Sequence, residues 1–268
     1  MTGAWTRIWA MVRRYSALHR RSLLRTFDVF FWPIMDLLVW GFVAVYFQRQ
    51  TQGPLGYGMG FLIGGMIFWD LYYRAQQGMT VSIMEEIWTR NIANLLVTPL
   101  RRWEWLTATI LYGLGKVLVI GVVLGGLASL LYAFRIWELG WGIVPLLIHL
   151  LLFAWSVGLV TAGCVIRFGY AAEALIWGIP FLIQPFTAAF YPVAVLPEAI
   201  QPLALALPST HVFEDLRAAL AGQPMVGWIH FLPLLPLTGL YLIAGIGVFA
   251  WCFLKAEQSG RLGRLGQD

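Results

Sequence analysis

Long apolar segments constrain this chain more than any other feature of its sequence. Six of them follow one another, and each is about as long as the roughly 20 residues that a helix needs to cross a bilayer. None alternates between apolar and polar residues with the two-residue period of a membrane strand, so the pattern predicts helices and not a β-barrel. The expected spans are 27–47, 57–83, 105–134, 143–166, 171–191 and 228–254.

The overall composition supports this prediction. Hydrophobic residues make up 60% of the 268 residues and charged residues only 12%, whereas a soluble domain has about a quarter charged residues. No internal repeat or low-complexity stretch divides the chain. We therefore expect an all-α integral membrane protein that forms one domain over residues 1–268.

Basic residues gather next to the apolar segments. The formal net charge is +5, and residues 1–25 hold six arginines interleaved with Trp5, Ile8 and Trp9. This mixture is typical of an amphipathic helix that lies in the membrane interface. The positive charge thus predicts contacts with membrane lipids and gives no reason to expect a nucleic-acid partner.

The distribution of positive charge also predicts the orientation, because cytoplasmic segments are enriched in Lys and Arg. If the N-terminus is cytoplasmic, only Arg49, Arg135 and Arg217 fall outside. We therefore expect both termini in the cytoplasm. The two cysteines, Cys164 and Cys252, lie in apolar segments, and their positions do not indicate a disulfide framework or a metal site.

Two further segments are too polar or too broken to span. Residues 85–100 form a charged cytoplasmic link between the second and third spans. Residues 193–224 contain four prolines, yet 200–207 is strongly apolar. Such a segment is expected to form a re-entrant hairpin or a pair of surface helices before the last span.

Catalytic and nucleotide-binding motifs are poorly represented. A phosphate-binding loop needs G-x-x-x-x-G-K-[ST], but Gly115-Lys116 is followed by Val117 and lies in an apolar segment. His211 and Glu214 fall close to an inverted zinc-protease pattern, but Asp215 stands where that pattern needs a second histidine. The sequence therefore predicts no catalytic residue, no metal and no cofactor in this chain.

Two patterns together resemble the permeases of type-2 ABC exporters, which move polysaccharides, lipid-linked glycans and drugs. The first is Leu196-Pro197, then Pro208-Ser209-Thr210-His211 and, after five intervening residues, Arg217. The second is the link 85–90 followed by Leu-Leu-x-x-Pro-Leu at 95–100, which is similar to the coupling helix of that family. Ser209 and Phe186 depart from the family pattern. The expected signature residues are Leu196, Pro197, Pro208, His211, Glu214 and Arg217.

The resemblance implies a permease subunit in a bacterial cytoplasmic (inner) membrane that exports a glycan, a lipid-linked or a drug-like amphiphilic substrate. It would act with a second permease copy and with a separate ABC ATPase dimer, which would bind ATP and Mg. The segment expected to couple the two proteins contains Glu85, Glu86, Arg90, Leu95, Leu96 and Pro99.

Four charged residues lie inside the predicted spans and away from their ends: Asp36, Asp70, Arg74 and Lys116. A charge in hydrocarbon costs several kcal/mol, so such groups face the bundle interior and pair. Asp70 and Arg74 are four residues apart and can pair on one helix. This leaves Asp36 and Lys116, which we expect to join the first and third spans, with a proton relay or a substrate site as the functional alternative.

Aromatic residues deep in the spans offer a second candidate site. Rings along a path would suit sugars or flat amphiphiles, while helix packing is the alternative explanation. The candidates are Trp40, Trp69, Tyr72, Tyr73, Trp155 and Trp177.

Two other function classes stay open at this stage. One is an ion- or proton-coupled carrier that uses Asp36, Asp70 and Lys116. The other is a membrane-embedded, lipid-modifying enzyme that acts through His211 and Glu214.

Overall fold

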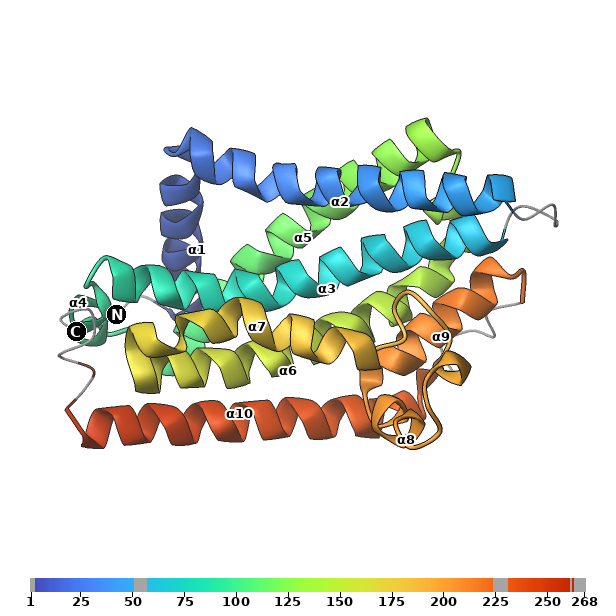
Figure 1. Ribbon diagram of the computed structural model, residues 1–268. Helices are drawn as coiled ribbons and strands as arrows, with labels where there is room; N and C mark the ends of the chain where they lie inside the picture. The colour runs from blue at the N-terminus through green and yellow to red at the C-terminus, as the bar shows by residue number, and fades with distance from the viewer. Residues whose placement is uncertain (1–2, 51–56, 224–230, 261, 263–268) are drawn as a thin grey trace.

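The computed structural model describes residues 3–50, 57–223, 231–260 and 262, and in these residues it contains helices and no strand. Figure 1 shows long helices that run side by side, with α1 crossing them steeply at one end. The helices are α1 (Ala4–Arg20), α2 (Leu23–Gln50), α3 (Tyr57–Trp88), α4 (Ile92–Leu96), α5 (Arg102–Tyr132), α6 (Ile143–Phe168), α7 (Glu173–Ile183), α8 (Gln201–Leu205), α9 (Pro208–Leu220) and α10 (Leu234–Gln258).

Within the described residues, four segments are long and apolar enough to cross a membrane. They are Leu23–Gln50, Arg102–Tyr132, Ile136–Phe186 and Leu234–Gln258. The third contains both α6 and α7, which pack against each other after a turn at Gly169, where φ is 64°. The all-helical prediction is confirmed, whereas the count of six spans stays a prediction.

Helix α3 corresponds to the second predicted span but is not among these four segments. It packs against α2, α5 and α6, and Ile67, Tyr72 and Ile83 on it are fully buried. A helix surrounded by other helices faces protein and not lipid, so it can carry polar groups that a lipid-facing helix would not tolerate. This position explains why α3 has a lower hydropathy than its neighbours.

Glycines allow two pairs of helices to approach closely. A Cβ atom on Gly78 of α3 would lie 2.7 Å from the Cα atom of Gly113 on α5. A Cβ atom on Gly245 of α10 would lie 2.7 Å from the carbonyl oxygen of Ser156 on α6. Small residues at such crossings are typical of packed membrane helices, because they bring the two backbones into contact.

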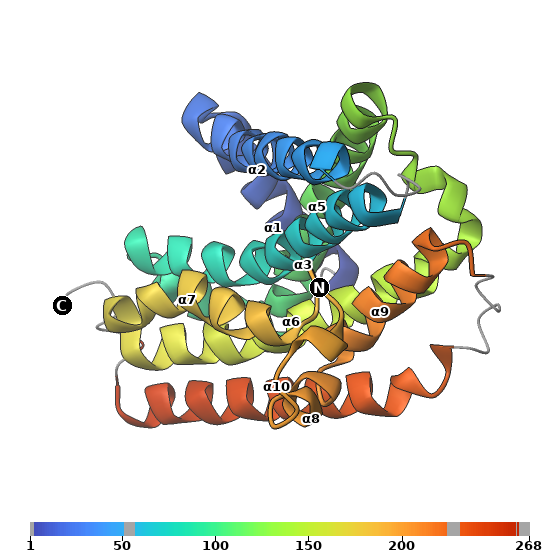
Figure 2. The ribbon, with the colours of Figure 1, turned by 45° about the vertical axis from the view of Figure 1, so that its right-hand side comes forward.

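The bundle has two distinct ends. Helix α1, helix α4 and the C-terminal end of α10 lie at one end, and α8 and α9 lie at the other (Figure 1). Figure 2 shows α9 beside α6 at that second end, where α9 packs against both α6 and α3. The bundle thus separates the predicted coupling segment from the predicted re-entrant segment by its full length.

The structure changes several predicted bounds. The interface helix ends at Arg20, and residues 23–25 already belong to α2. The described part of the predicted re-entrant segment, residues 193–223, contains α8 and α9, and Pro208 opens α9, as expected for a proline at the first helical position. Residue 224, the start of the sixth predicted span at Trp228, and Arg261 and Arg264 lie outside the described residues.

Candidate functional site

The first ion pair at the α1 end joins α1 to α5. Arg7 Nε donates to Glu104 Oε2 at 2.9 Å, and the backbone N–H of Arg101 donates to the same oxygen at 3.0 Å. Glu104 is fully buried. Because its carboxylate both caps the start of α5 and binds α1, it fixes the two helices together.

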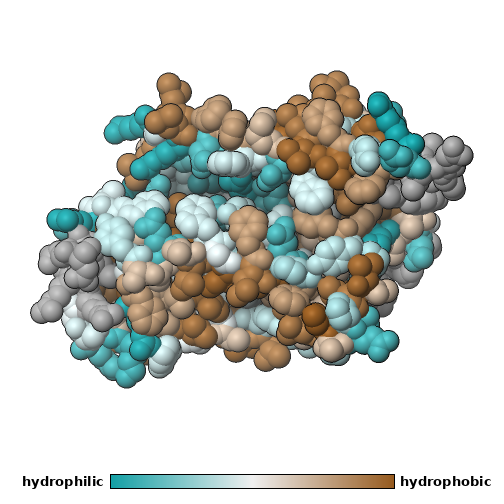
Figure 3. All heavy atoms as spheres, viewed as in Figure 1, coloured by the Kyte–Doolittle hydropathy of each residue, from teal (hydrophilic) through white to brown (hydrophobic). Residues whose placement is uncertain are grey.

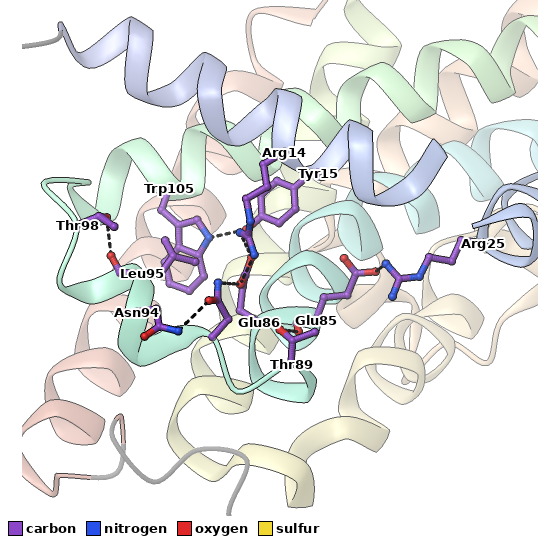
Figure 4. A network of polar contacts seen from close by, with 11 residues as sticks. Arg14, Tyr15, Arg25, Glu85, Glu86, Thr89, Asn94, Leu95, Thr98 and Trp105 are labelled. Carbon is purple, nitrogen blue, oxygen red and sulfur yellow. Dashed lines mark hydrogen bonds and ion pairs between the residues drawn. The ribbon is translucent and has the colours of Figure 1, made fainter. Parts of the chain in front are cut away.

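The second ion pair joins α1 to the end of α3 (Figure 4). Arg14 Nη2 lies 3.0 Å from Glu86 Oε2, and Asn91 Nδ2 donates to that oxygen at 2.7 Å. These hydrogen bonds from Arg14 to Glu86 raise the pKa of Arg14. Next to the pair, Trp105 Nε1 donates to the hydroxyl of the buried Tyr15 at 2.8 Å, and burial raises the pKa of that hydroxyl.

The third ion pair comes from the beginning of α2. Arg25 Nη1 lies 3.1 Å from Glu85 Oε1. We call the three pairs Arg7–Glu104, Arg14–Glu86 and Arg25–Glu85 the charge clamp. The clamp joins α1, α2, α3 and α5 at one end of the bundle.

The clamp corrects one part of the sequence-based interpretation. Glu85 and Glu86 were expected to belong to the segment that couples to a protein partner; the structure shows both bound within the chain, with Glu86 only 1% exposed, and their coupling role stays a prediction. The sequence analysis did not identify Arg7, Arg14 and Arg25 as the partners of these carboxylates. A signal for them existed, because Arg7 and Arg14 are seven residues apart and therefore share one face of α1.

Helix α4 follows the clamp directly and presents a small apolar surface. Leu95 is buried, whereas Leu96 is 43% exposed and Val97 is 84% exposed. Pro99 and Arg90 are also exposed, and Arg90 has φ of 54° in the turn between α3 and α4. Of the predicted coupling residues, Arg90, Leu96 and Pro99 have exposed surfaces that a partner could reach.

The second candidate site is a groove between α2, α3 and α7. In Figure 3 hydrophilic residues gather in the hollow below α2, between two bands of hydrophobic residues. The groove encloses a cavity of about 460 Å³. Its lining residues are Asp28, Trp32 and Asp36 on α2, Asp70, Tyr73, Arg74 and Gln77 on α3, and Trp177 and Phe181 on α7.

We call this groove between α2, α3 and α7 the polar groove. Several of its polar atoms have unused hydrogen-bonding capacity. Arg74 Nε lies 3.5 Å from Asp70 Oδ1, so the local pair predicted from the sequence is present. However, Asp70 Oδ2, Arg74 Nε and Gln77 Nε2 are buried without a hydrogen-bond partner. Buried polar groups are normally satisfied, so these atoms mark a place where water or a ligand belongs.

The predicted link between Asp36 and Lys116 is wrong. Asp36 lines the polar groove, whereas Lys116 lies over the ring of Tyr112, with its Nζ 4.6 Å from the ring centroid. Among the described residues Lys116 forms no ion pair, and it lines a neighbouring cavity of about 340 Å³ together with Arg25 and Glu85. The two cavities adjoin, but Asp36 lines only the groove and Lys116 lines only its neighbour.

His19 lies in the same neighbouring cavity as Lys116. Burial, together with the charges of Lys116 and Arg25, lowers the pKa of His19 to about 4. His19 is therefore neutral at physiological pH and adds no charge to this cavity.

The structure divides the six candidate path aromatics. Tyr73 and Trp177 line the polar groove. Trp69 and Tyr72 pack in the core, with ring centroids 5.1 Å apart, and Trp155 packs against that core. Trp40 stacks on Phe190 at 4.6 Å. Sequence reasoning missed two other rings of the groove, Trp32 and Phe181, although each lies four residues from another lining residue.

The predicted signature residues hold a loop at the opposite end. Arg217 forms an ion pair with Glu214 and donates from Nη2 to the carbonyl oxygen of Ala188 at 2.8 Å. Glu214 Oε1 accepts the backbone N–H of Val193 at 2.8 Å. His211 Nε2 donates to the carbonyl oxygen of Leu205 at 2.8 Å. These contacts fasten residues 188–205 onto α9.

The remaining signature residues shape the same loop. The carbonyl oxygen of Leu196 accepts a hydrogen bond from Gln201 Nε2 at 2.9 Å, and that of Pro197 accepts the backbone N–H of Ile200 at 2.8 Å. In the part of the chain that the structure describes, no group of three or more His, Cys, Asp or Glu side chains is placed to hold a metal ion.

Comparisons with known proteins give one consistent result. Over 95 residues, 33% of this chain, it is 32% identical to the capsule polysaccharide export inner-membrane protein CtrC of Neisseria meningitidis serogroup B. Over 131 residues, 46% of this chain, it is 28% identical to the protein of the same name from serogroup A. No protein-family model matches the chain.

The similarity is weak and partial. The matched regions are 36% and 49% of these relatives, so the chain spans about a third to a half of the length of the curated relatives it matches. To this extent the resemblance inferred from the sequence is confirmed, and both relatives are named as capsule polysaccharide export inner-membrane proteins.

Proposed function

We propose that this chain is the permease subunit of a type-2 ABC exporter in a bacterial cytoplasmic membrane, with six spans. The observation that carries the proposal is the similarity to a capsule polysaccharide export inner-membrane protein over 131 residues. The apolar helices support it, as does the separation of the predicted coupling segment and the predicted re-entrant segment at opposite ends of the bundle. The substrate is an exported glycan or a related amphiphile.

The position of Asp36 supports a path along the polar groove. Asp36 lies near the middle of α2, and it is exposed on the isolated chain. A carboxylate at that depth is too costly in lipid, so it must face water or protein. A second copy of the chain that covers this face would provide both, with the path between the two copies.

Energy would come from a separate ABC ATPase dimer that binds ATP and Mg. The exposed Leu96 and Val97 on and after α4 form the docking surface at the end that we place in the cytoplasm, together with both termini. The charge clamp joins α3, the helix that leads into α4, to α1, α2 and α5, and Asn91 just before α4 donates to Glu86. Movement of the ATPase subunits would therefore be passed to the helices beside the groove.

The other two function classes gain less support. The enzyme hypothesis needs His211 and Glu214 as reactive groups, but both side chains are bound to the loop at residues 188–205. The ion-coupled carrier would use Asp36 and Asp70, and it would transport without an ATPase. Dependence of transport on an ATPase partner separates the carrier from the proposal.

The docking surface provides the test. We expect the double variant Leu96→Asp, Val97→Asp to lose roughly thirtyfold or more in affinity for the ATPase, since buried apolar anchors of an interface contribute about 2 kcal/mol or more. Copurification of the ATPase and stimulated ATP hydrolysis in vesicles are the measurements.

A matched control changes the same residue types at the opposite end. Val195→Asp, Leu203→Asp replaces side chains that are 67% and 54% exposed, and it should leave ATPase binding unchanged. If the first double variant binds the ATPase as well as the parent chain does, the docking surface is wrong. If no ATPase copurifies with the parent chain and transport follows an ion gradient, the proposed function fails.

A further inference from the structure

The polar groove has an unequal set of charges. Asp28, Asp36 and Asp70 contribute three carboxyl groups, and Arg74 contributes one guanidinium group, which is already paired with Asp70. Lys116 and Arg25 line the adjoining cavity, which shares Asp28 and Arg74 with the groove, and Arg25 is paired there with Glu85. Asp36 and Asp70 line only the groove, where Arg74 is the one cation among the lining residues, so this part of the groove has an excess of carboxyl groups.

The hydrogen-bonding groups at the floor of the groove are buried and partly unused. Asp70 is 4% exposed and Gln77 is 8% exposed, and each has an atom without a partner, Asp70 Oδ2 and Gln77 Nε2. One is an acceptor and the other a donor. A ligand that offers both hydroxyl donors and hydroxyl or ring-oxygen acceptors would satisfy them together.

Aromatic rings stand beside these polar groups. Trp32 is 56% exposed, Trp177 is 41% exposed and Phe181 is 53% exposed, and all three line the cavity. Rings bury apolar area at low cost while a neighbouring polar group binds the polar edge of the ligand. A sugar ring, with a C–H face and a rim of hydroxyl groups, has both surfaces.

We propose that the polar groove binds a sugar unit that is uncharged or carries an amine, and that it rejects a sugar unit that carries a carboxylate. The inference rests on the proposed function, because it makes the groove a part of the export path. An acidic sugar would bring a further negative charge beside three carboxyl groups and one guanidinium group, and like charges brought together in a desolvated site disfavour binding.

The spacing along the helices explains why these groups converge. Asp28, Trp32 and Asp36 follow one another at four-residue intervals on α2, so they form one stripe. Asp70, Arg74 and Gln77 form a similar stripe on α3, and Trp177 and Phe181 form one on α7. Packing brings the three stripes around one cavity.

Binding to the purified chain in lipid nanodiscs, without an ATPase, tests the proposal. The probes are three β-1,4-linked tetrasaccharides of glucose, glucosamine and glucuronic acid, which share one backbone and differ in charge. Isothermal titration calorimetry at physiological salt should give tighter binding of the glucosamine and glucose tetramers than of the glucuronic acid tetramer, by about tenfold or more.

Two variants separate charge from ring contacts. Asp36→Asn should reduce the preference over glucuronic acid to less than about threefold, because it removes a carboxylate. Trp177→Ala should weaken all three tetramers by a similar factor. Glu138→Gln, which removes an exposed carboxylate outside the groove, should change nothing.

The outcomes separate this inference from the proposed function. Equal or tighter binding of the glucuronic acid tetramer overturns the inference, and so does a failure of all three tetramers to bind. Neither result affects copurification of the ATPase, which tests the proposed function alone. A preference that survives Asp36→Asn, Asp70→Asn unchanged would also overturn it.

Discussion

The charge clamp and the polar groove use the same kinds of residues in opposite ways. In the clamp each carboxylate has an arginine partner, and Glu86 also accepts a hydrogen bond from Asn91. In the groove Asp70 and Gln77 are buried with unused atoms, and Asp36 has no ion pair within the part of the chain that the structure describes.

This difference separates a structural role from a binding role. A satisfied ion pair between helices fixes their positions, because removing one partner leaves the other charge buried and alone. A buried polar group without a hydrogen-bond partner lowers the stability of the isolated chain. A binding site can retain such a group because a ligand or water forms the missing hydrogen bond. The clamp therefore should be required for folding, and the groove for binding.

Reversal of one clamp charge should have the largest effect on stability. Glu86→Lys places a cation beside Arg14 in a buried position, and we expect a loss of about 3 kcal/mol in the free energy of unfolding. This is the low end of the range for broken buried pairs, since the Arg14 side chain is 36% exposed. Thermal unfolding of the purified chain in detergent measures the loss.

A charge exchange tests whether the pair itself is responsible. Arg14→Glu, Glu86→Arg should recover most of the lost stability. Arg13→Glu, at an exposed neighbouring position, serves as the control and should behave like the parent chain. If Glu86→Lys unfolds at the parent temperature, the clamp does not hold the helices.

A change in the groove should have a smaller effect and the opposite sign. Gln77→Met removes a buried amide with an unpartnered Nε2 atom, so we expect stability to stay constant or to rise by up to about 1 kcal/mol. Transport should fall, since the donor at the groove floor is lost. A large loss of stability in Gln77→Met would show that this residue belongs to the packed structure.

The smallest effect should come from an ion pair that is neither buried nor part of the clamp. Arg102 Nη2 lies 2.8 Å from Glu257 Oε2, and both side chains are about half exposed. Exposed pairs contribute about 0–1 kcal/mol, so Glu257→Gln should change the free energy of unfolding by no more than about 0.5 kcal/mol. A loss comparable to that of Glu86→Lys would show that burial is not what distinguishes the clamp.

Particular elements show how far sequence reasoning reached. The apolar segments correctly predicted the long helices, because hydropathy over about 20 residues depends on local sequence alone. The pair Asp70–Arg74 was also predictable, since four residues on a helix bring two side chains together. The ion pairs of the charge clamp could not be predicted in this way, because Arg14 and Glu86 are 72 residues apart in the sequence.

The sequence by itself determined that this chain is helical, that it is apolar enough for a membrane, and which residues share a face of each helix. Only the tertiary structure decided which faces meet. It placed Glu85 and Glu86 against arginines of α1 and α2, separated Asp36 from Lys116, and gathered Asp28, Asp36 and Asp70 with the rings of α7 around one cavity. The physical reason is that helix periodicity is a local property, whereas the pairing of faces depends on close packing between helices, such as the contact of Gly78 with Gly113, which no local pattern specifies.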